Sequence, residues 1–194
     1  MSANQTRATL DIVSDVVCPW CYIGKRRLQR ALELLDPAIE LKLRWQPYEL
    51  NPSMPPGGLE RGAYYTAKFG SEAGAASLIE NVSANAHNDG LEMDYSRIAR
   101  VPNTIAAHRL IWYAARTDCQ DAVVDGLFRA YFVDGRNIED NDVLADIAVA
   151  AGIDRGAVTA LLASDEGFDL VRDAPQPDHP PGIHGGRAAG SHTR

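Results

Sequence analysis

The sequence predicts an α/β protein with one strand–helix–strand unit and a large α-helical segment after it. Residues 8–50 contain a β-branched run, then apolar residues with helical period, then an alternating strand pattern. Residues 59–170 carry apolar residues at helical spacing. Residues 171–194 contain almost no apolar residue, so no further strand is predicted there and the composition is typical of a disordered tail. These three ranges are the predicted domain organisation.

The first strand and the helix after it meet at two cysteines. The strand is expected to be buried, since it lies in an apolar run rich in β-branched residues: Leu10, Ile12, Val13, Val16 and Val17. The helix is indicated by apolar residues three and four positions apart: Leu28, Ala31, Leu32 and Leu35. Pro19 lies where this helix begins, because its missing N–H costs nothing there and its fixed φ suits the first turn. We therefore expect Cys18 at the N-terminus of the helix.

Cys18-Pro19-Trp20-Cys21 has the spacing of a redox-active dithiol. A helix N-terminus stabilises a thiolate, so the pKa of Cys18 is expected to fall from about 8.5 to between about 3.5 and 7.5. Cys18 is the predicted nucleophile, and Cys21, one helical turn later on the same face, is predicted to resolve the mixed disulfide. Pro19 and Trp20 are expected to tune the couple, but the sequence leaves the direction of electron flow open.

Two other uses of paired cysteines need residues that this sequence lacks. A zinc site needs a second pair of ligands, but the only other cysteine is Cys119 and no two histidines have the usual spacing. Haem attachment needs a histidine after the second cysteine, where Tyr22 stands. No metal site is therefore predicted, and Cys119 is expected to be an ordinary half-buried thiol.

The segment from Ser14 to Gly24, with the sequence SDVVCPWCYIG, resembles the active-site segment of DsbA-family thioredoxin-fold proteins, in particular the cytosolic FrnE-like branch. It is also similar to the related 2-hydroxychromene-2-carboxylate isomerases, which generally carry Ser where Cys18 stands. The resemblance implies a thioredoxin-like fold with a large helical insertion and the activity of a thiol-disulfide oxidoreductase. It also implies that Asn103 and His108 lie near the substrate cleft, although a histidine on the apolar face of a helix is more often simply packed in the core.

The second strand follows the first helix. Apolar residues alternate with polar and charged ones in this strand, which predicts one buried face: Ile39, Leu41, Leu43 and Trp45. A strand–helix–strand unit of this length predicts two parallel strands with a right-handed crossover. Residues 47–58 are rich in Pro and Gly, so they are expected to form a connection that leaves the sheet.

Helices are predicted over most of residues 59–170. The predicted helices are Tyr64–Phe69, Glu72–Ala86, a helix capped by Asn103 or Thr104 and ending near Arg116, a helix through Val123 and Phe132, a helix capped by Asn141 and ending near Ala151, and a helix from about Asp154 to Ala163. The aromatic residues Tyr64, Tyr65, Trp112 and Tyr131 either line an apolar groove or belong to the core, and the core is the commoner outcome at helical spacing.

The composition limits the possible binding partners and the cellular compartment. The net charge of −7 and the pI near 5.2 argue against nucleic acid or an anionic membrane as a partner. Residues 1–9 lack the apolar core of a signal peptide, so a cytoplasmic protein is expected, acting on protein or small-molecule thiols and disulfides. No cofactor is expected beyond the cysteine pair, and the isomerase relatives imply glutathione as a co-substrate.

The end of the sequence departs from the family pattern. The resemblance implies further strands and a cis-proline loop that faces the dithiol, and residues 171–194 contain neither. We expect these strands to be missing or replaced, either in a natural short variant or through a shifted reading frame. An unpaired apolar edge would then remain on the first strand and favour a homodimer. The alternatives to the oxidoreductase are a glutathione-dependent isomerase of small aromatic substrates and an inactive truncated family member.

Overall fold

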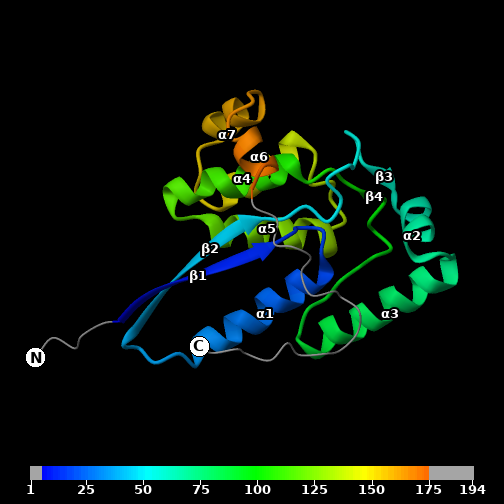
Figure 1. Ribbon diagram of the computed structural model, residues 1–194, viewed down its shortest axis with the longest axis horizontal. Helices are drawn as coiled ribbons and strands as arrows, with labels where there is room; N and C mark the ends of the chain where they lie inside the picture. Colours follow the sequence, from blue (N-terminus) through cyan, green and yellow to red (C-terminus); the bar gives the residue numbers. More distant parts are fainter. Residues whose placement is uncertain (1–5, 175–194) are drawn as a thin grey trace, which may run out of the picture.

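The computed structural model describes residues 6–174 of the 194-residue chain. It opens with β1 (Thr6–Ser14), α1 (Pro19–Glu33) and β2 (Ile39–Pro47). The two strands pair in parallel, from Thr6 opposite Ile39 to Ser14 opposite Pro47. The predicted strand–helix–strand unit is therefore confirmed. Figure 1 shows α1 on one side of this pair and α4 and α5 on the other.

The expectation that β1 is a buried strand is wrong. Leu10 and Val13 are 36% and 44% exposed, and only Ser14 at the end of the strand is buried. In the part of the chain that the structure describes, β1 pairs only with β2, and α4 and α5 pack against β2. Val16 and Val17 are buried, but they lie after the strand in the turn that leads to α1.

The remaining elements follow the predicted helical pattern. The helices after β2 are α2 (Arg61–Phe69), α3 (Glu72–Asn88), α4 (Ile105–Ala114), α5 (Gln120–Phe132), α6 (Asn141–Ala150), α7 (Arg155–Leu162) and α8 (Phe168–Arg172), with a short 3₁₀ turn η1 (Ala115–Thr117) after α4. Asp140, and not Asn141, caps α6, because its side chain accepts from the N–H of Asp142. Asn103 Oδ1 accepts from the N–H of Ile105 at the start of α4.

Two short strands were not predicted. β3 (Leu59–Glu60) pairs antiparallel with β4 (Arg100–Val101) and ties the beginning of α2 to the segment before α4. At two residues each, these strands are too short to produce an alternating pattern in the sequence. Together they hold the loop after β2 and the loop before α4 side by side.

The main core lies between the helices. Most of its largest completely buried side chains belong to α4 and α5: Tyr131, Phe128, Phe132, Leu110 and Leu127. Tyr22 of α1 joins this core, since its ring stacks on Phe128 with centroids 5.0 Å apart. The helix that carries the dithiol is therefore packed firmly against the helical segment.

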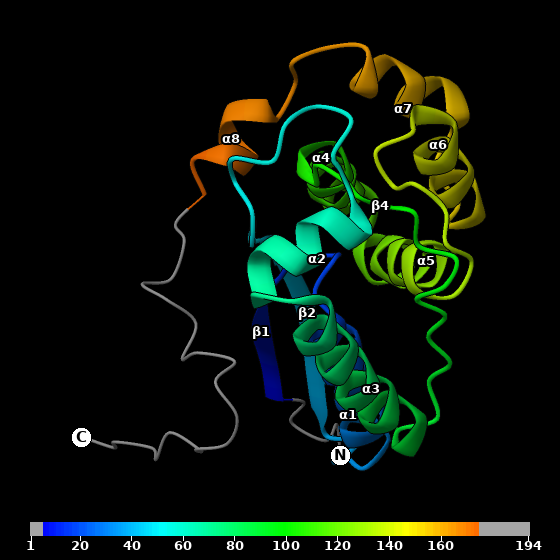
Figure 2. The ribbon, with the colours of Figure 1, turned by 90° about the vertical axis from the view of Figure 1, so that its right-hand side faces the viewer.

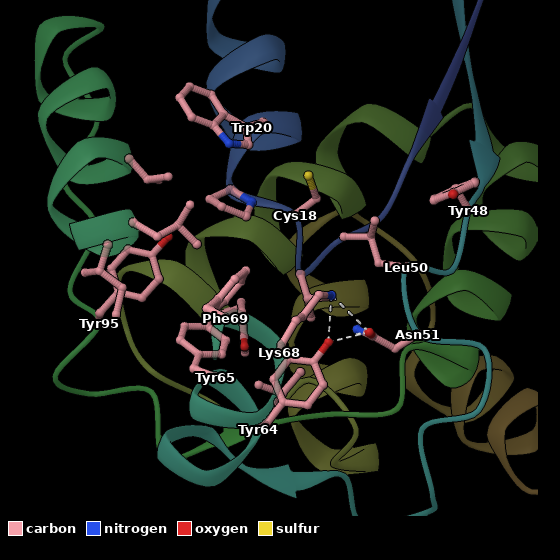
Figure 3. Close-up of a pocket in the computed structure, with 17 residues that line it drawn as sticks. Cys18, Trp20, Tyr48, Leu50, Asn51, Tyr64, Tyr65, Lys68, Phe69 and Tyr95 are labelled. Atoms are coloured by element: carbon pink, nitrogen blue, oxygen red, sulfur yellow. Dashed lines mark hydrogen bonds between the residues drawn. The ribbon is translucent and has the colours of Figure 1, made fainter. Parts of the chain in front are cut away.

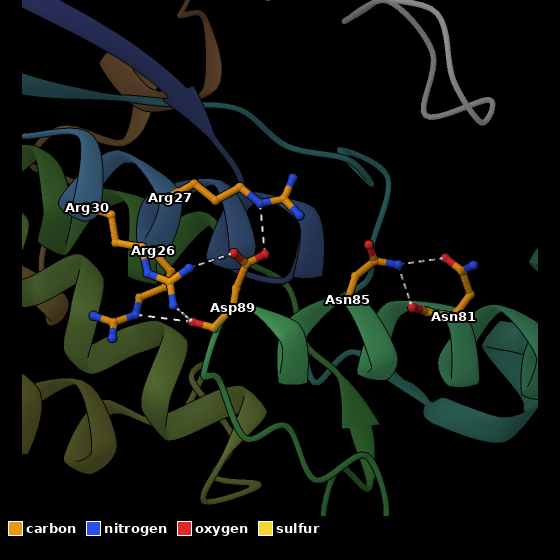
Figure 4. A network of polar contacts seen from close by, with 6 residues as sticks. All are labelled: Arg26, Arg27, Arg30, Asn81, Asn85 and Asp89. Carbon is orange, nitrogen blue, oxygen red and sulfur yellow. Dashed lines mark hydrogen bonds and ion pairs between the residues drawn. The ribbon is translucent and has the colours of Figure 1, made fainter.

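Ion pairs join α1 to the end of α3. Asp89 follows α3, and its carboxylate accepts from Arg27 Nε at 2.8 Å and from Arg30 Nη1 at 3.1 Å (Figure 4). Its backbone carbonyl accepts a further bond from Arg30. This cluster fixes α3 along α1, and Figure 2 shows α2 and α3 beyond the carboxyl ends of β1 and β2.

The helical segment extends past its predicted end at residue 170. Val171 is 1% exposed and lies inside α8, which ends at Arg172, so the predicted boundary at residue 171 falls within a packed helix. Residues 175–194 lie outside the described part of the chain. Between residues 6 and 174, no strand follows β4. No helix in this range is both long and apolar enough to cross a membrane.

Candidate active site

The two cysteines of the CPWC segment begin α1. Cys18 is the N-cap residue with extended backbone (φ −88°, ψ 111°), and Pro19 is the first helical residue, as predicted. The backbone N–H groups of Cys21 and Tyr22 donate to the carbonyl of Cys18 at 3.1 and 3.2 Å. Cys18 is only 3% exposed and Cys21 is half-buried. Both are free thiols, as is Cys119.

The two thiols share one hydrogen bond, which moves their pKa values in opposite directions. The bond donated by Cys18 lowers the pKa of Cys21 from 9.0 to about 7, against the opposing effect of burial, and the nearby Ser14 hydroxyl lowers it further. The pKa of Cys18 is raised, first by the same hydrogen bond and then by burial. The low pKa that we expected at Cys18 therefore belongs to the pair, and the sulfur that carries the charge depends on the position of the shared proton. Because coupled thiols titrate as a pair, the first proton leaves the pair near pH 7 and the second leaves far above it.

A cavity of about 330 Å³ opens beside Cys18 (Figure 3). Its walls come from the start of α1, the loop after β2, and the helices α2 and α3. Pro19 and Trp20 line it together with Cys18, whereas Cys21 does not. Cys18 is therefore the thiol that a molecule in the cavity meets.

Aromatic side chains form a large part of the cavity wall. Of the four aromatic residues singled out in the sequence, Tyr64, Tyr65 and Tyr131 line it, and Trp112 does not. Trp112 packs instead against Arg116, whose guanidinium carbon lies 4.4 Å from its ring centre. The cavity wall is completed by further aromatic and aliphatic side chains: Tyr48, Leu50, Phe69, Leu78, Ile79, Val82, Tyr95 and Val101.

Tyr65, Tyr95 and Tyr131 of this wall stay neutral. Burial raises the pKa of Tyr65 to about 12 and raises the pKa values of Tyr95 and Tyr131 further. The nearby Cys18 also contributes to the raised pKa of Tyr65 and Tyr95. At physiological pH these hydroxyls can donate hydrogen bonds to a ligand, and they carry no charge.

Among the residues that the structure describes, Lys68 is the only charged one that lines the cavity. Its Nζ donates to Tyr64 Oη at 2.8 Å and to Asn51 Oδ1 at 3.2 Å, and Tyr64 Oη donates to the same Asn51 oxygen (Figure 3). No carboxylate lies within ion-pair distance of Lys68 among the described residues. The cavity of this acidic protein therefore carries one positive charge, which favours an anionic group on a ligand.

Contrary to the resemblance, Asn103 and His108 do not line this cavity. Asn103 holds loops together: its Nδ2 donates to the carbonyl of Met54 at 2.7 Å, and its N–H donates to Glu139 Oε2 at 3.1 Å. His108 is 1% exposed within α4, as the core interpretation predicted. It is not surrounded by apolar groups alone, because its Nε2 lies 3.5 Å from Oδ1 of Asp15.

Sequence reasoning missed three residues of this region: Asp15, Lys68 and Asn51. Asp15 precedes the dithiol by three positions, and an acidic residue at the end of an apolar run was a usable signal. Lys68 and Asn51 gave no such sequence signal, because Lys68 lies on the surface of a helix and Asn51 lies in a loop. The described residues contain no group of three or more His, Cys, Asp or Glu side chains placed to hold a metal ion.

Comparison with protein families gives a match over nearly the whole chain. Residues 9–185 match the model of the DSBA-like thioredoxin domain. A probable DsbA oxidoreductase from Streptomyces coelicolor has a similar structure, with 31% identity and a TM-score of 0.76, over 87% of this chain and 73% of the other.

Two further solved structures share the fold at lower identity. A 2-hydroxychromene-2-carboxylate isomerase aligns with 18% identity and a TM-score of 0.61, over 86% of this chain and 78% of the isomerase. The cytosolic disulfide reductase DsbM from Pseudomonas aeruginosa, solved with glutathione, aligns with 22% identity and a TM-score of 0.53, over 86% of this chain and 78% of DsbM.

Proposed function

Because the chain belongs to the family of DSBA-like thioredoxin domains, we propose that it is a thiol-disulfide oxidoreductase whose reacting groups are Cys18 and Cys21. One observation carries the proposal. Cys18 caps α1 and lines the cavity, while Cys21, one helical turn later and outside the cavity lining, has a pKa lowered to about 7. One thiol can thus meet the substrate while the other holds the negative charge near neutral pH.

The reaction begins when the proton moves along the hydrogen bond from Cys18 to Cys21. The Cys18 thiolate attacks one sulfur of a substrate disulfide, a bond forms between them, and the other substrate sulfur leaves as a thiolate that takes up a proton. Cys21 then loses its proton and attacks Cys18 Sγ. The Cys18–Cys21 disulfide forms and the second substrate thiolate is released, so two electrons pass from the dithiol to the substrate. The reverse sequence oxidises a dithiol.

Several parts of the proposal concern partners and compartment. The substrates are protein or small-molecule thiols and disulfides, glutathione is a co-substrate, and the cysteine pair needs no further cofactor. The single cavity lysine, Lys68, supports an anionic thiol such as glutathione. Action in the cytoplasm is supported by the description of DsbM as cytosolic.

The roles divide along the chain. We place the redox chemistry in the thioredoxin-like part, residues 8–50, with Pro19 and Trp20 shaping the immediate surroundings of Cys18. The helical insertion, residues 59–170, supplies most of the substrate-binding wall through α2 and α3. Cys119 has no place in this reaction, since its thiol donates to the carbonyl of Thr117 beside the start of α5.

A glutathione-dependent isomerase of small aromatic substrates is the second candidate. The aromatic cavity of about 330 Å³ favours it, because its volume suits a small molecule better than a polypeptide. Cys18→Ser separates the two functions: an isomerase would keep turnover with a serine at this position, and an oxidoreductase would lose it.

The deciding experiment is a redox titration of the purified protein against glutathione buffers, with alkylatable thiols counted at each ratio. We expect a two-electron transition that disappears in Cys18→Ser and in Cys21→Ser and persists in Cys119→Ser. If wild-type protein shows no such transition although it unfolds cooperatively on heating, the oxidoreductase proposal fails. Without cooperative unfolding, the inactive truncated member is the remaining explanation.

A further inference from the structure

Two buried side chains near the dithiol carry polar atoms that have no hydrogen bond to nitrogen or oxygen. Between residues 6 and 174 these side-chain atoms are Ser14 Oγ and the two ring nitrogens of His108. Ser14 ends β1, and its hydroxyl faces the sulfur of Cys21 and lowers the pKa of that thiol, so His108 is the side chain left to explain. His108 reaches toward the neighbouring residue, Asp15, from α4. Buried polar groups without partners are rare, and each one calls for an explanation.

Asp15 and His108 form a completely buried pair. The side chain of each is 1% exposed, and Nε2 of His108 lies 3.5 Å from Oδ1 of Asp15. The Asp15 carboxylate also accepts from the N–H of Leu50 at 2.7 Å and from the N–H of Val17 at 3.2 Å. Two amide donors favour the ionised carboxylate, and an ionised carboxylate at this depth requires a balancing cation. His108 is the only basic side chain within ion-pair distance of Asp15 among the described residues.

The same carboxylate is coupled to the reacting sulfurs. Its backbone carbonyl accepts from the N–H of Cys18 at 3.1 Å, so Asp15 is fixed to the first residue of the dithiol. Its charge opposes ionisation of both thiols. The groups that face this pair are Cys18 and Cys21 of α1, Glu49 after β2, and Tyr131 of α5.

We propose that His108 is a positioning residue that acts on the dithiol through Asp15, because its imidazole is the basic group that faces this buried carboxylate beside the reacting sulfurs. This rests on the proposed function only in taking the dithiol as the reacting group. Without the imidazole, Asp15 has no basic partner within ion-pair distance among the described residues, and its charge opposes the thiolate more strongly. Loss of His108 should therefore reduce the fraction of the dithiol that is ionised near neutral pH.

The test measures thiol ionisation and needs no disulfide substrate. All proteins carry Cys119→Ser, and the rate of alkylation by a neutral reagent is followed across pH. We expect His108→Gln to lower the rate near pH 7 by about three- to tenfold, since a tenfold change corresponds to about one unit of pKa. Asp15→Asn should raise the rate. In the double variant, adding His108→Gln to Asp15→Asn should change nothing, because the imidazole has lost the carboxylate through which it acts.

Two results would overturn the proposal. One is an unchanged alkylation rate in His108→Gln. The other is that His108→Gln lowers the alkylation rate by the same factor in the wild-type background and in the Asp15→Asn background. Circular dichroism checks that each variant is folded. If neither His108→Gln nor His108→Asn folds, the double variants with Asp15→Asn decide, and their rates must equal that of Asp15→Asn alone. A further loss of rate in these double variants would contradict the proposal. If the variants show the expected alkylation rates but the protein does not turn over disulfides, the proposed function fails and the role of His108 stands.

Discussion

The side-chain amide of Gln120 pairs with the backbone of Trp45 as a neighbouring strand would. Its Oε1 accepts from the N–H of Trp45 at 3.1 Å, and its Nε2 donates to the carbonyl of the same residue at 3.2 Å. A second bond from Nε2 reaches the carbonyl of Ile111 in α4. One buried side chain therefore satisfies the open edge of β2 and fixes it to both α4 and α5.

Replacing Gln120 should destabilise the protein. In Gln120→Leu, the N–H and carbonyl of Trp45 lose their partners in a buried place, so we expect the free energy of unfolding to fall by about 1–3 kcal/mol. Urea denaturation followed by circular dichroism measures this. Gln29→Leu is the matched control, because Gln29 makes only one long contact, 3.5 Å to Asp125. Equal stability of the two variants would show that the pairing at β2 contributes little.

The low pKa of Cys21 should depend on a donor at position 18. Cys18→Ala removes the hydrogen bond and leaves burial, which raises the pKa, so half-maximal alkylation of Cys21 should move from near pH 7 to higher pH by about one unit or more. In Cys18→Ser the hydroxyl can still donate, and the profile should stay closer to that of wild type. The pH dependence of alkylation, measured in Cys119→Ser protein, tests both. Identical profiles for Ala and Ser would exclude the hydrogen bond as the cause.

Lys68 should contribute to the binding of anionic substrates. In Lys68→Met we expect the KM for glutathione disulfide to rise by about two- to fivefold, a modest effect because this lysine is exposed to solvent. The rate with a neutral disulfide and the alkylation of Cys18 should not change. Lys42→Met is the control, since Lys42 pairs with Asp118 and does not line the cavity. An equal effect of both variants would indicate a general influence of charge.

The exposed strand β1 should mediate self-association. Sedimentation of the wild type is expected to show a concentration-dependent dimer, and Val13→Lys should weaken it by placing charge on an unpaired strand edge. Val149→Lys is the matched control, because Val149 is 46% exposed on α6 and away from the sheet. A monomeric wild type at all concentrations would contradict this prediction.

The local sequence pattern was sufficient to predict most helices and the position of the dithiol at the start of α1. Pro19 and the helical spacing after it placed Cys18 at the start of α1, and capping residues placed most helices within a few positions. Exposure of β1 could not be read from the run through Leu10 and Val13, because burial depends on which elements pack against a strand. The acidity of the pair could not be predicted from helix position alone, since it depends on which sulfur donates to the other.

The charged partners of the site were the least predictable part. His108 and Asp15 are separated by more than half of the described chain and meet only when α4 packs beside the end of β1. A single buried histidine gives the same sequence signal whether it faces a carboxylate or only apolar groups. The resemblance placed His108 near the substrate cleft, whereas the structure buries it in α4 beside Asp15 and outside the cavity lining.

Much of the cavity wall comes from a different stretch of the chain than the reactive sulfur does. The sulfur belongs to the first turn of α1, whereas Tyr64, Tyr65, Lys68 and Phe69 belong to α2. Substitutions in α2 can therefore change which molecules are accepted without altering the electron-transfer chemistry. A lineage with this architecture can acquire new substrates by varying one short helix, and a protein engineer can do the same with a library confined to Arg61–Phe69.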